Sequence, residues 1–248
     1  MENAIQLIDA DIPRAQVSSP IAVVKQVNWS VARGDFWVIG AQPGAGKTDL
    51  LCTAAGLQKP MRGAQLLFGK NSDEMSEEEL VQARLRIAMV FTNGRLFNAL
   101  TTAQNIALPL TYHHDLNEAD LSERVSEALK KTGLTAWQNK RPDQITRNLH
   151  QRIGLARALA LRPEVLLVDN PLGGVDPRMG RWWLDFLCEA QKETTIVVTT
   201  DDFRAWLDVG THFALLKDRR METIGSREQI RESKDDLVRE LLTPAFES

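Results

Sequence analysis

Ala41-Gln42-Pro43-Gly44-Ala45-Gly46-Lys47-Thr48 is the stretch that decides the fold. It follows an apolar run at residues 36–39 that predicts a strand, and it leads into residues 46–57, which predict a helix. Gly44 and Gly46 let backbone N–H groups approach a phosphate, while the N-terminus of the following helix contributes the positive end of its dipole. A strand, a Gly-rich loop and a helix in this order are typical of a phosphate-binding P-loop.

Two side chains of this loop carry the expected chemistry. Lys47 is expected to reach the β- and γ-phosphates of a nucleotide, and Thr48 to ligate Mg²⁺. The strict pattern opens with glycine, whereas here Ala41 takes that place directly after Gly40. A dinucleotide fingerprint is excluded, because its third glycine would fall at Asp49. The residues expected to surround the nucleotide are Ala41, Gln42, Pro43, Gly44, Ala45, Gly46, Lys47, Thr48 and Asp49.

Asp169 is expected to hold Mg²⁺ together with Thr48. It ends a fully apolar run at residues 165–168, which is typical of a buried parallel strand. P-loop proteins keep a Mg²⁺-holding aspartate at such a strand end. A GTPase would need Asn-Lys-x-Asp, and Asn139-Lys140-Arg141-Pro142 fails at its fourth position.

The rest of the chain alternates between expected strands and expected helices. Residues 93–162 are the exception, because they are mostly helical, with breaks expected at Pro109 and Pro142. This organisation predicts an α/β fold with a mainly parallel sheet and a helical insertion. Further strands are expected at 21–31, 64–68, 86–91 and 195–199, and further helices at 76–85, with Ser76 and Glu79 as a capping box, 178–191 and 227–242.

Composition limits the class of protein. The 248 residues carry 30 basic and 33 acidic side chains, and the net charge of −3 gives no electrostatic reason to expect nucleic acid or anionic lipid as the main ligand. The first eleven residues lack the positive start of a signal peptide, and the uncharged run 96–114 is too polar to span a bilayer. Cys52 and Cys188 cannot form a disulfide framework, so we expect a reducing cytoplasm and any membrane role through a partner.

Four motifs together resemble the ATP-binding cassette (ABC) ATPases, and the likeness covers nearly the whole chain. The matches are Gly44-Ala45-Gly46-Lys47-Thr48 for Walker A, Leu167-Val168-Asp169 for Walker B, Gln151-Arg152-Ile153-Gly154-Leu155-Ala156-Arg157-Ala158-Leu159 for the helix after the signature motif, and Gly174-Val175-Asp176-Pro177 for the D-loop. The resemblance implies one P-loop NTPase domain over 1–248, with a mixed β-sheet core, a helical subdomain inserted at about 93–162, and a C-terminal helical tail at about 226–248.

Residues 94–110 and the tail 236–242 look most like the cassettes that energise MCE-associated phospholipid transporters. The family resemblance implies ATP and Mg²⁺ as ligands and a second cassette as partner, in a homodimer or a heterodimer. It also implies a membrane permease, an MCE-domain lipid-binding protein, and a cytoplasmic place on the inner face of the membrane through that permease. Asp176 of the D-loop belongs to the catalytic set that the resemblance implies.

Five features of the ABC pattern are altered or missing in this sequence. Thr92 stands where the family has its Q-loop glutamine, Asn170 where it has the glutamate after Walker B, and Thr200 where it has the switch histidine. The family signature Leu-Ser-Gly-Gly-Gln aligns with Ile145-Thr146-Arg147-Asn148-Leu149. An aromatic residue to stack on adenine has no match near residues 12–14.

The departures concentrate in the groups that drive hydrolysis. Asn170 cannot act as a general base, which typically contributes ~10²–10⁴-fold in rate, although it can orient a water. Thr200 keeps a hydroxyl without the reach of an imidazole, and Thr92 is too short to copy a glutamine. The phosphate and Mg²⁺ positions are kept, so the sequence predicts a chain that binds Mg-ATP with weak or no turnover.

Several alternatives stay open. In the altered signature, Thr146 can still donate a hydroxyl, while Arg147 and Asn148 hinder close backbone approach. Arg147 is either an arginine finger for a partner's γ-phosphate or a solvated or locally paired side chain. Asp201 and Asp202 either have a loop role or contact the water at the γ-phosphate. The chain itself is either the ATPase subunit of a transporter or a hydrolysis-deficient, nucleotide-gated partner of another ATPase subunit.

Overall fold

A computed structural model describes residues 3–14, 21–113 and 116–243. The chain divides into two compact units: one built from residues up to 89 and from 164 onward, here the core unit, and one built from residues 90–163, here the helical unit. Among the described residues, no helix is long and apolar enough to cross a membrane.

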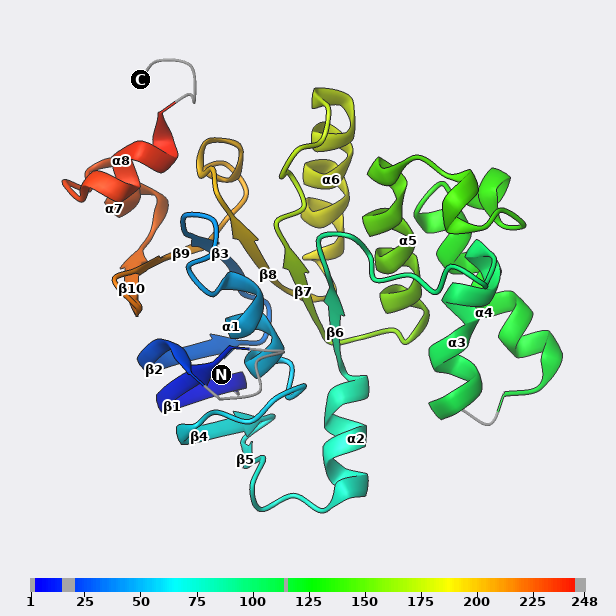
Figure 1. The fold of residues 1–248 in the computed structure, drawn as a ribbon, viewed down its shortest axis with the longest axis horizontal. Coiled ribbons are helices and arrows are strands. Elements are labelled where there is room, and N and C mark those ends of the chain that lie inside the picture. The colour runs from blue at the N-terminus through cyan, green and yellow to red at the C-terminus, as the bar shows by residue number, and fades with distance from the viewer. Residues whose placement is uncertain (1–2, 15–20, 114–115, 244–248) are drawn as a thin grey trace. The chain divides into compact units, whose positions relative to one another are not determined.

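A mixed sheet forms the centre of the core unit (Figure 1), with the strand order β10-β9-β3-β8-β7-β6 among the described residues. β3 pairs in parallel with β8 and β9, β8 pairs in parallel with β7, and β10 runs antiparallel to β9. The predicted α/β fold with a mixed β-sheet core is confirmed. The bounds are β3 (Phe36–Gly40), β6 (Ile87–Val90), β7 (Val165–Asp169), β8 (Thr195–Thr200), β9 (His212–Lys217) and β10 (Arg220–Gly225).

A second, antiparallel sheet of the core unit has the order β2-β1-β4-β5. Ile5 and Leu7 of its first strand share one buried cluster with Leu167 and Val197 of the mixed sheet and with Leu50 of α1 (Lys47–Ala54). Burial of this apolar surface, at roughly 25 cal/mol per Å², is what holds the two sheets together around α1. The strand bounds are β1 (Asn3–Pro13), β2 (Ala22–Ala32), β4 (Arg62–Leu67) and β5 (Lys70–Asn71).

Local capping defines the other helices of the core unit. The predicted capping box at Ser76 and Glu79 is present at the start of α2 (Glu77–Leu85). α6 spans Pro177–Ala190. The single helix predicted over 227–242 is wrong, because the structure has two, α7 (Arg227–Arg231) and α8 (Asp236–Leu242). Asp235 restarts the helix, since its carboxylate accepts the backbone N–H groups of Leu237 and Val238.

The helical unit packs three helices around Ile106, Leu110 and Ile153. The break predicted at Pro109 is wrong, since Pro109 lies inside α3. The neighbouring side chains Ile106 and Leu110 are fully buried, and their packing outweighs the helix hydrogen bond that proline cannot make. The break predicted at Pro142 is present, because Pro142 begins a short 3₁₀ helix that is separate from the α-helices on either side. The elements are α3 (Thr102–His113), α4 (Glu118–Lys131), η1 (Thr135–Trp137), η2 (Pro142–Gln144) and α5 (Arg147–Ala160).

Candidate functional site

Residues 41–48, the phosphate loop, connect the end of β3 to the start of α1. The loop begins where the Ala41 N–H donates to the Thr200 carbonyl across 3.0 Å, which ties it to β8. Gly44 and Gly46 have φ of 81° and 100°, in the left-handed region that favours glycine. A side chain placed at Gly44 would meet nothing within 4 Å, so the backbone here faces open space. The loop therefore has the form of a cradle for an anion at the N-terminus of α1.

Lys47 is half-buried beside this cradle. Its Nζ donates to the Ala41 carbonyl at 2.5 Å and to the Gln42 carbonyl at 3.2 Å, so the ammonium lies over the loop. Burial lowers the pKa of Lys47, and the carboxylates of Asp201 and Asp169 oppose that shift. A bound phosphate would offer this partly desolvated cation a stronger acceptor than two carbonyl groups.

Thr48 and Asp169, which the sequence paired as Mg²⁺ ligands, are brought together. The Thr48 Oγ1 donates to Asp169 Oδ2 across 2.7 Å, and the Thr199 hydroxyl donates to Asp169 Oδ1 across 2.8 Å. Mg²⁺ prefers hard oxygen ligands and binds proteins through one or two carboxylates, with phosphate and water completing its shell. Among the described residues, no group of three or more His, Cys, Asp or Glu side chains lies close enough together to hold a metal ion. This hydroxyl–carboxylate pair at the cradle fits a metal that arrives with a nucleotide.

The remaining loop residues have mostly structural contacts. The exposed Gln42 side chain donates to both carboxylate oxygens of Glu240 on α8, each at 3.1 Å. The Asp49 carbonyl accepts from Gln58 at 2.9 Å, within and beside α1. Pro43 is exposed and Ala45 is half-buried.

Asn170 follows Asp169 in a left-handed conformation, with φ of 46°. Its backbone N–H donates to the Thr199 carbonyl at 3.1 Å, and its Nδ2 donates to Asp201 Oδ2 at 3.2 Å. The Asn170 Oδ1 is buried without a hydrogen-bond partner. Gly173 leaves room for this amide, because a side chain there would overlap it.

Thr200 ends β8 and is 1% exposed. Its hydroxyl donates to the Asp202 carbonyl at 2.8 Å and accepts from the Asp202 N–H at 3.1 Å and the Trp206 Nε1 at 3.2 Å. The hydroxyl thus closes the turn after β8. Asp176 also has a structural contact, because its carboxylate accepts the N–H groups of Arg178 and Met179 and caps α6.

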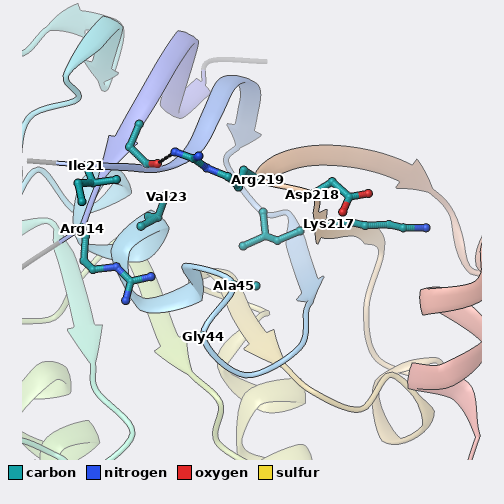
Figure 2. Close-up of a pocket in the computed structure, with 10 residues that line it drawn as sticks. Arg14, Ile21, Val23, Gly44, Ala45, Lys217, Asp218 and Arg219 are labelled. Atoms are coloured by element: carbon teal, nitrogen blue, oxygen red, sulfur yellow. Dashed lines mark hydrogen bonds between the residues drawn. The ribbon is translucent and has the colours of Figure 1, made fainter.

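A cavity of about 640 Å³ adjoins the phosphate loop. Figure 2 shows Arg14 on one side of it and Lys217, Asp218 and Arg219 on the other, with Ala45 between them. The Arg219 guanidinium donates to the Ala22 carbonyl. The sequence analysis did not identify residues 217–219 as part of this cavity. A polar turn between two strands would have indicated them, and the structure shows that turn in the positive φ angles of Asp218 and Arg219.

The signature and Q-loop positions belong to the helical unit. Thr92 is exposed shortly after β6. Thr146 is the N-cap of α5, and Arg147 and Asn148 begin that helix with exposed side chains. These positions are accessible to another molecule.

Comparisons with known proteins match this arrangement. A family model described as ABC transporter matches residues 24–173. The methionine import ATP-binding protein MetN of Ligilactobacillus salivarius is 33% identical over 224 residues, covering 88% of this chain and 63% of the relative. The probable ribonucleotide transport ATP-binding protein mkl of Mycobacterium leprae is 30% identical over 220 residues, with the same two shares. The chain thus spans about three fifths of the length of these curated relatives.

A solved structure has the same fold. It is described as the dimeric post-hydrolysis state of the ATP-binding cassette MJ0796 bound to ADP and Pi. Its TM-score to this chain is 0.79 at 27% identity, and the match covers 88% of this chain and 98% of that one.

Proposed function

This chain belongs to the ABC transporter ATPase cassettes, and from that premise we propose that it binds Mg-ATP and drives a separate membrane permease. One observation carries the proposal. The Thr48 hydroxyl and the Asp169 carboxylate meet at 2.7 Å beside the cradle of Gly44 and Gly46, and Lys47 lies over the same loop. A cation, a hydroxyl–carboxylate pair and free backbone space at one helix N-terminus suit a Mg-nucleotide.

Each part of this site has a separate task in binding. The backbone N–H groups of the loop bind phosphate oxygens, and Lys47 adds a charge toward the β- and γ-phosphates. Thr48 and Asp169 would hold Mg²⁺, which supplies neutralisation of the phosphate charge. The open Gly44 position supports this assignment, since nothing within 4 Å obstructs the approach of an anion there.

The opposing candidate is a cassette that binds nucleotide, closes on a partner and hydrolyses little itself. Two observations favour it. Asn170 lacks the carboxylate of a general base, and the hydroxyl of Thr200 is engaged by Asp202 and Trp206 inside the core unit. We therefore expect slower turnover than a cassette that keeps the glutamate and the histidine.

The partners and the cargo are part of the proposal. The exposed Thr146, Arg147 and Asn148 would face a second cassette, either another copy or a different chain. We propose a lipid cargo and an MCE-domain partner from the likeness of residues 94–110 and 236–242 to cassettes of that kind. Two relatives are named for methionine import and for ribonucleotide transport, so methionine and ribonucleotides are the alternative cargoes that the experiment must distinguish from a lipid.

The test is purification of the chain from membranes in mild detergent, followed by identification of the subunits that accompany it. A permease and an MCE-domain protein would support the lipid assignment, whereas a permease with another binding protein would replace it. Absence of any membrane partner would overturn the transport proposal.

Nucleotide binding is then measured on the same preparation. Lys47→Ala should abolish Mg-ATP binding. The matched control is Lys59→Ala, because Lys59 is an exposed lysine paired with Asp73 at 2.6 Å, and its loss should leave binding unchanged.

A further inference from the structure

Three strand ends of the core unit meet at one edge of the mixed sheet (Figure 1). β8 lies between β3 and β7, and both neighbours run parallel to it. Thr200 of β8 is level with Gly40, and Thr199 is level with Asp169. The residue after β8, Asp201, is thereby placed between the phosphate loop on one side and Asn170 on the other.

We propose that Asp201 is the carboxylate that accepts the proton of the attacking water during ATP hydrolysis, and that Asn170 is the positioning residue that holds it. This inference rests on the proposed function, because it concerns the γ-phosphate end of the same nucleotide site. It assigns the role of the missing base to the residue that follows the neighbouring strand β8, rather than to the residue after Asp169.

The hydrogen bonds of the three nearby carboxylates favour Asp201. Asp169 already accepts from Thr48 and Thr199 with one oxygen each, at 2.7 and 2.8 Å. Asp202 accepts from the Arg204 guanidinium with both oxygens, at 2.9 and 3.0 Å from Nε. Asp201 is exposed, so water can reach it, and Asn170 Nδ2 holds one of its oxygens at 3.2 Å.

Asn170 is itself held in a way that suits a positioning role. A carboxylate can only accept, so the contact to Asp201 requires the NH₂ end of the amide to face it. That choice leaves Asn170 Oδ1 buried without a partner, so the amide gives up a hydrogen bond at one end in order to hold Asp201 at the other.

Lys47 completes the geometry. Its Nζ donates to the Ala41 carbonyl at 2.5 Å, and the Ala41 N–H donates at 3.0 Å to the carbonyl of Thr200, the residue directly before Asp201. Lys47 is expected at the β- and γ-phosphates, so a carboxylate near its ammonium is near the reacting phosphorus.

Hydrolysis of ATP at this site needs water as its only other reactant. The water oxygen forms a bond to the γ-phosphorus while the bond from that phosphorus to the β–γ bridging oxygen breaks. The water proton passes to an Asp201 oxygen, ADP leaves with the electron pair of the broken bond, and the proton then returns to solvent or to the released phosphate. Asp201 is left as it began.

The experiment uses the chain purified with its accompanying subunits and measures two quantities for each variant, namely steady-state turnover and the affinities for Mg-ATP and Mg-ADP by calorimetry. Asp201→Asn should lower kcat by about 10²-fold or more, as loss of a general base does. It should also raise affinity for Mg-ATP by about threefold to tenfold and leave that for Mg-ADP unchanged, because a negative charge near the γ-phosphate is gone. Asp202→Asn is the matched control and should change neither quantity.

Two Asn170 variants test the positioning role. Asn170→Ala should lower kcat about tenfold with KM unchanged, the effect of losing one hydrogen bond to a charged group. Asn170→Glu restores a carboxylate after Asp169, so the double variant Asn170→Glu, Asp201→Asn should recover the turnover that Asp201→Asn loses. A structural role for Asp201 would not allow this rescue.

Failure of the inference differs from failure of the proposed function. Two results would show that Asp201 is not the base while leaving nucleotide binding intact. In the first, the wild-type chain binds Mg-ATP but turns it over no faster than Lys47→Ala. In the second, Asp201→Asn leaves both kcat and the ratio of ATP to ADP affinity unchanged. If the wild-type chain binds no Mg-ATP, the proposed function itself falls, and the inference with it.

Discussion

Trp206 donates its indole N–H to the hydroxyl of Thr200 across 3.2 Å, inside the core unit at the end of β8. Both residues are almost completely buried. The same hydroxyl bonds the backbone of Asp202 twice, so position 200 closes a turn here. A side chain that closes a buried turn is not free to reach a phosphate.

This geometry predicts the result of restoring a histidine. Thr200→His should destabilise the chain by about 1–3 kcal/mol, because an imidazole overfills the space beside Trp206 and forfeits the three hydrogen bonds. Turnover should not rise. Urea unfolding and ATP turnover check both points, and Thr223→His, at an exposed position on β10, should leave stability within about 0.5 kcal/mol. An active, fully stable Thr200→His chain would contradict this account of position 200.

Gly40 should tolerate no side chain. It ends β3 directly before the phosphate loop, and a methyl group there would overlap the Phe203 ring. Gly40→Ala should therefore cost about 1–3 kcal/mol of unfolding free energy, and Phe203→Leu in the same chain should recover part of it.

Gly180→Ala is the control for Gly40→Ala, because it should raise the unfolding free energy instead of lowering it. Gly180 lies inside α6, and a methyl group there would make only ordinary contacts, the nearest at 3.9 Å. Gly180→Ala should stabilise the chain by about 0.5–1 kcal/mol through helix propensity. Thermal unfolding of the two variants should shift in opposite directions, and a Gly40→Ala chain that is not destabilised would show that the ring of Phe203 can move aside.

Thr48 should act on nucleotide binding only through Mg²⁺. Thr48→Val removes the hydroxyl that meets Asp169 at 2.7 Å but keeps the shape of the side chain. We expect the gain in ATP affinity on adding Mg²⁺ to fall at least about tenfold, with affinity in EDTA unchanged. Thr48→Ser keeps the hydroxyl and should behave as wild type. Equal losses with and without Mg²⁺ would mean that Thr48 only shapes the loop.

The sequence predicted those features whose cause is local. The phosphate loop follows from residues 41–48 alone, because strand, glycines and helix are contiguous, and the capping box of Ser76 and Glu79 closes within one turn. The two-helix tail was missed although its signal, Asp235 as an N-cap, is also local. Its charged pattern continues across the break and conceals it.

Features that depend on distant parts of the chain could not be predicted in the same way. β1 pairs with both β2 and β4, and β9 depends on β3 for its place in the sheet. Pro109 stays within α3, where Ile106 and Leu110 are buried in a cluster with residues of α4 and α5. The contact of Asn170 with Asp201 follows from the register of β7 against β8, which no spacing between residues 170 and 201 reveals.

Lys47 should take up a proton when nucleotide binds at alkaline pH. Burial holds its pKa below the ordinary 10.5 in the free chain, and phosphate oxygens beside the ammonium favour the charged form and raise that pKa again. Between the lowered and the raised pKa, the complex holds more protons than the free chain, so ATP affinity should fall as pH rises through that window. Below the window both states are protonated and affinity should not change for this reason. Calorimetry in two buffers of different ionisation enthalpy measures the uptake directly. Lys47→Arg is the control, because a guanidinium stays protonated throughout, and uptake that persisted in it would assign the proton to another group.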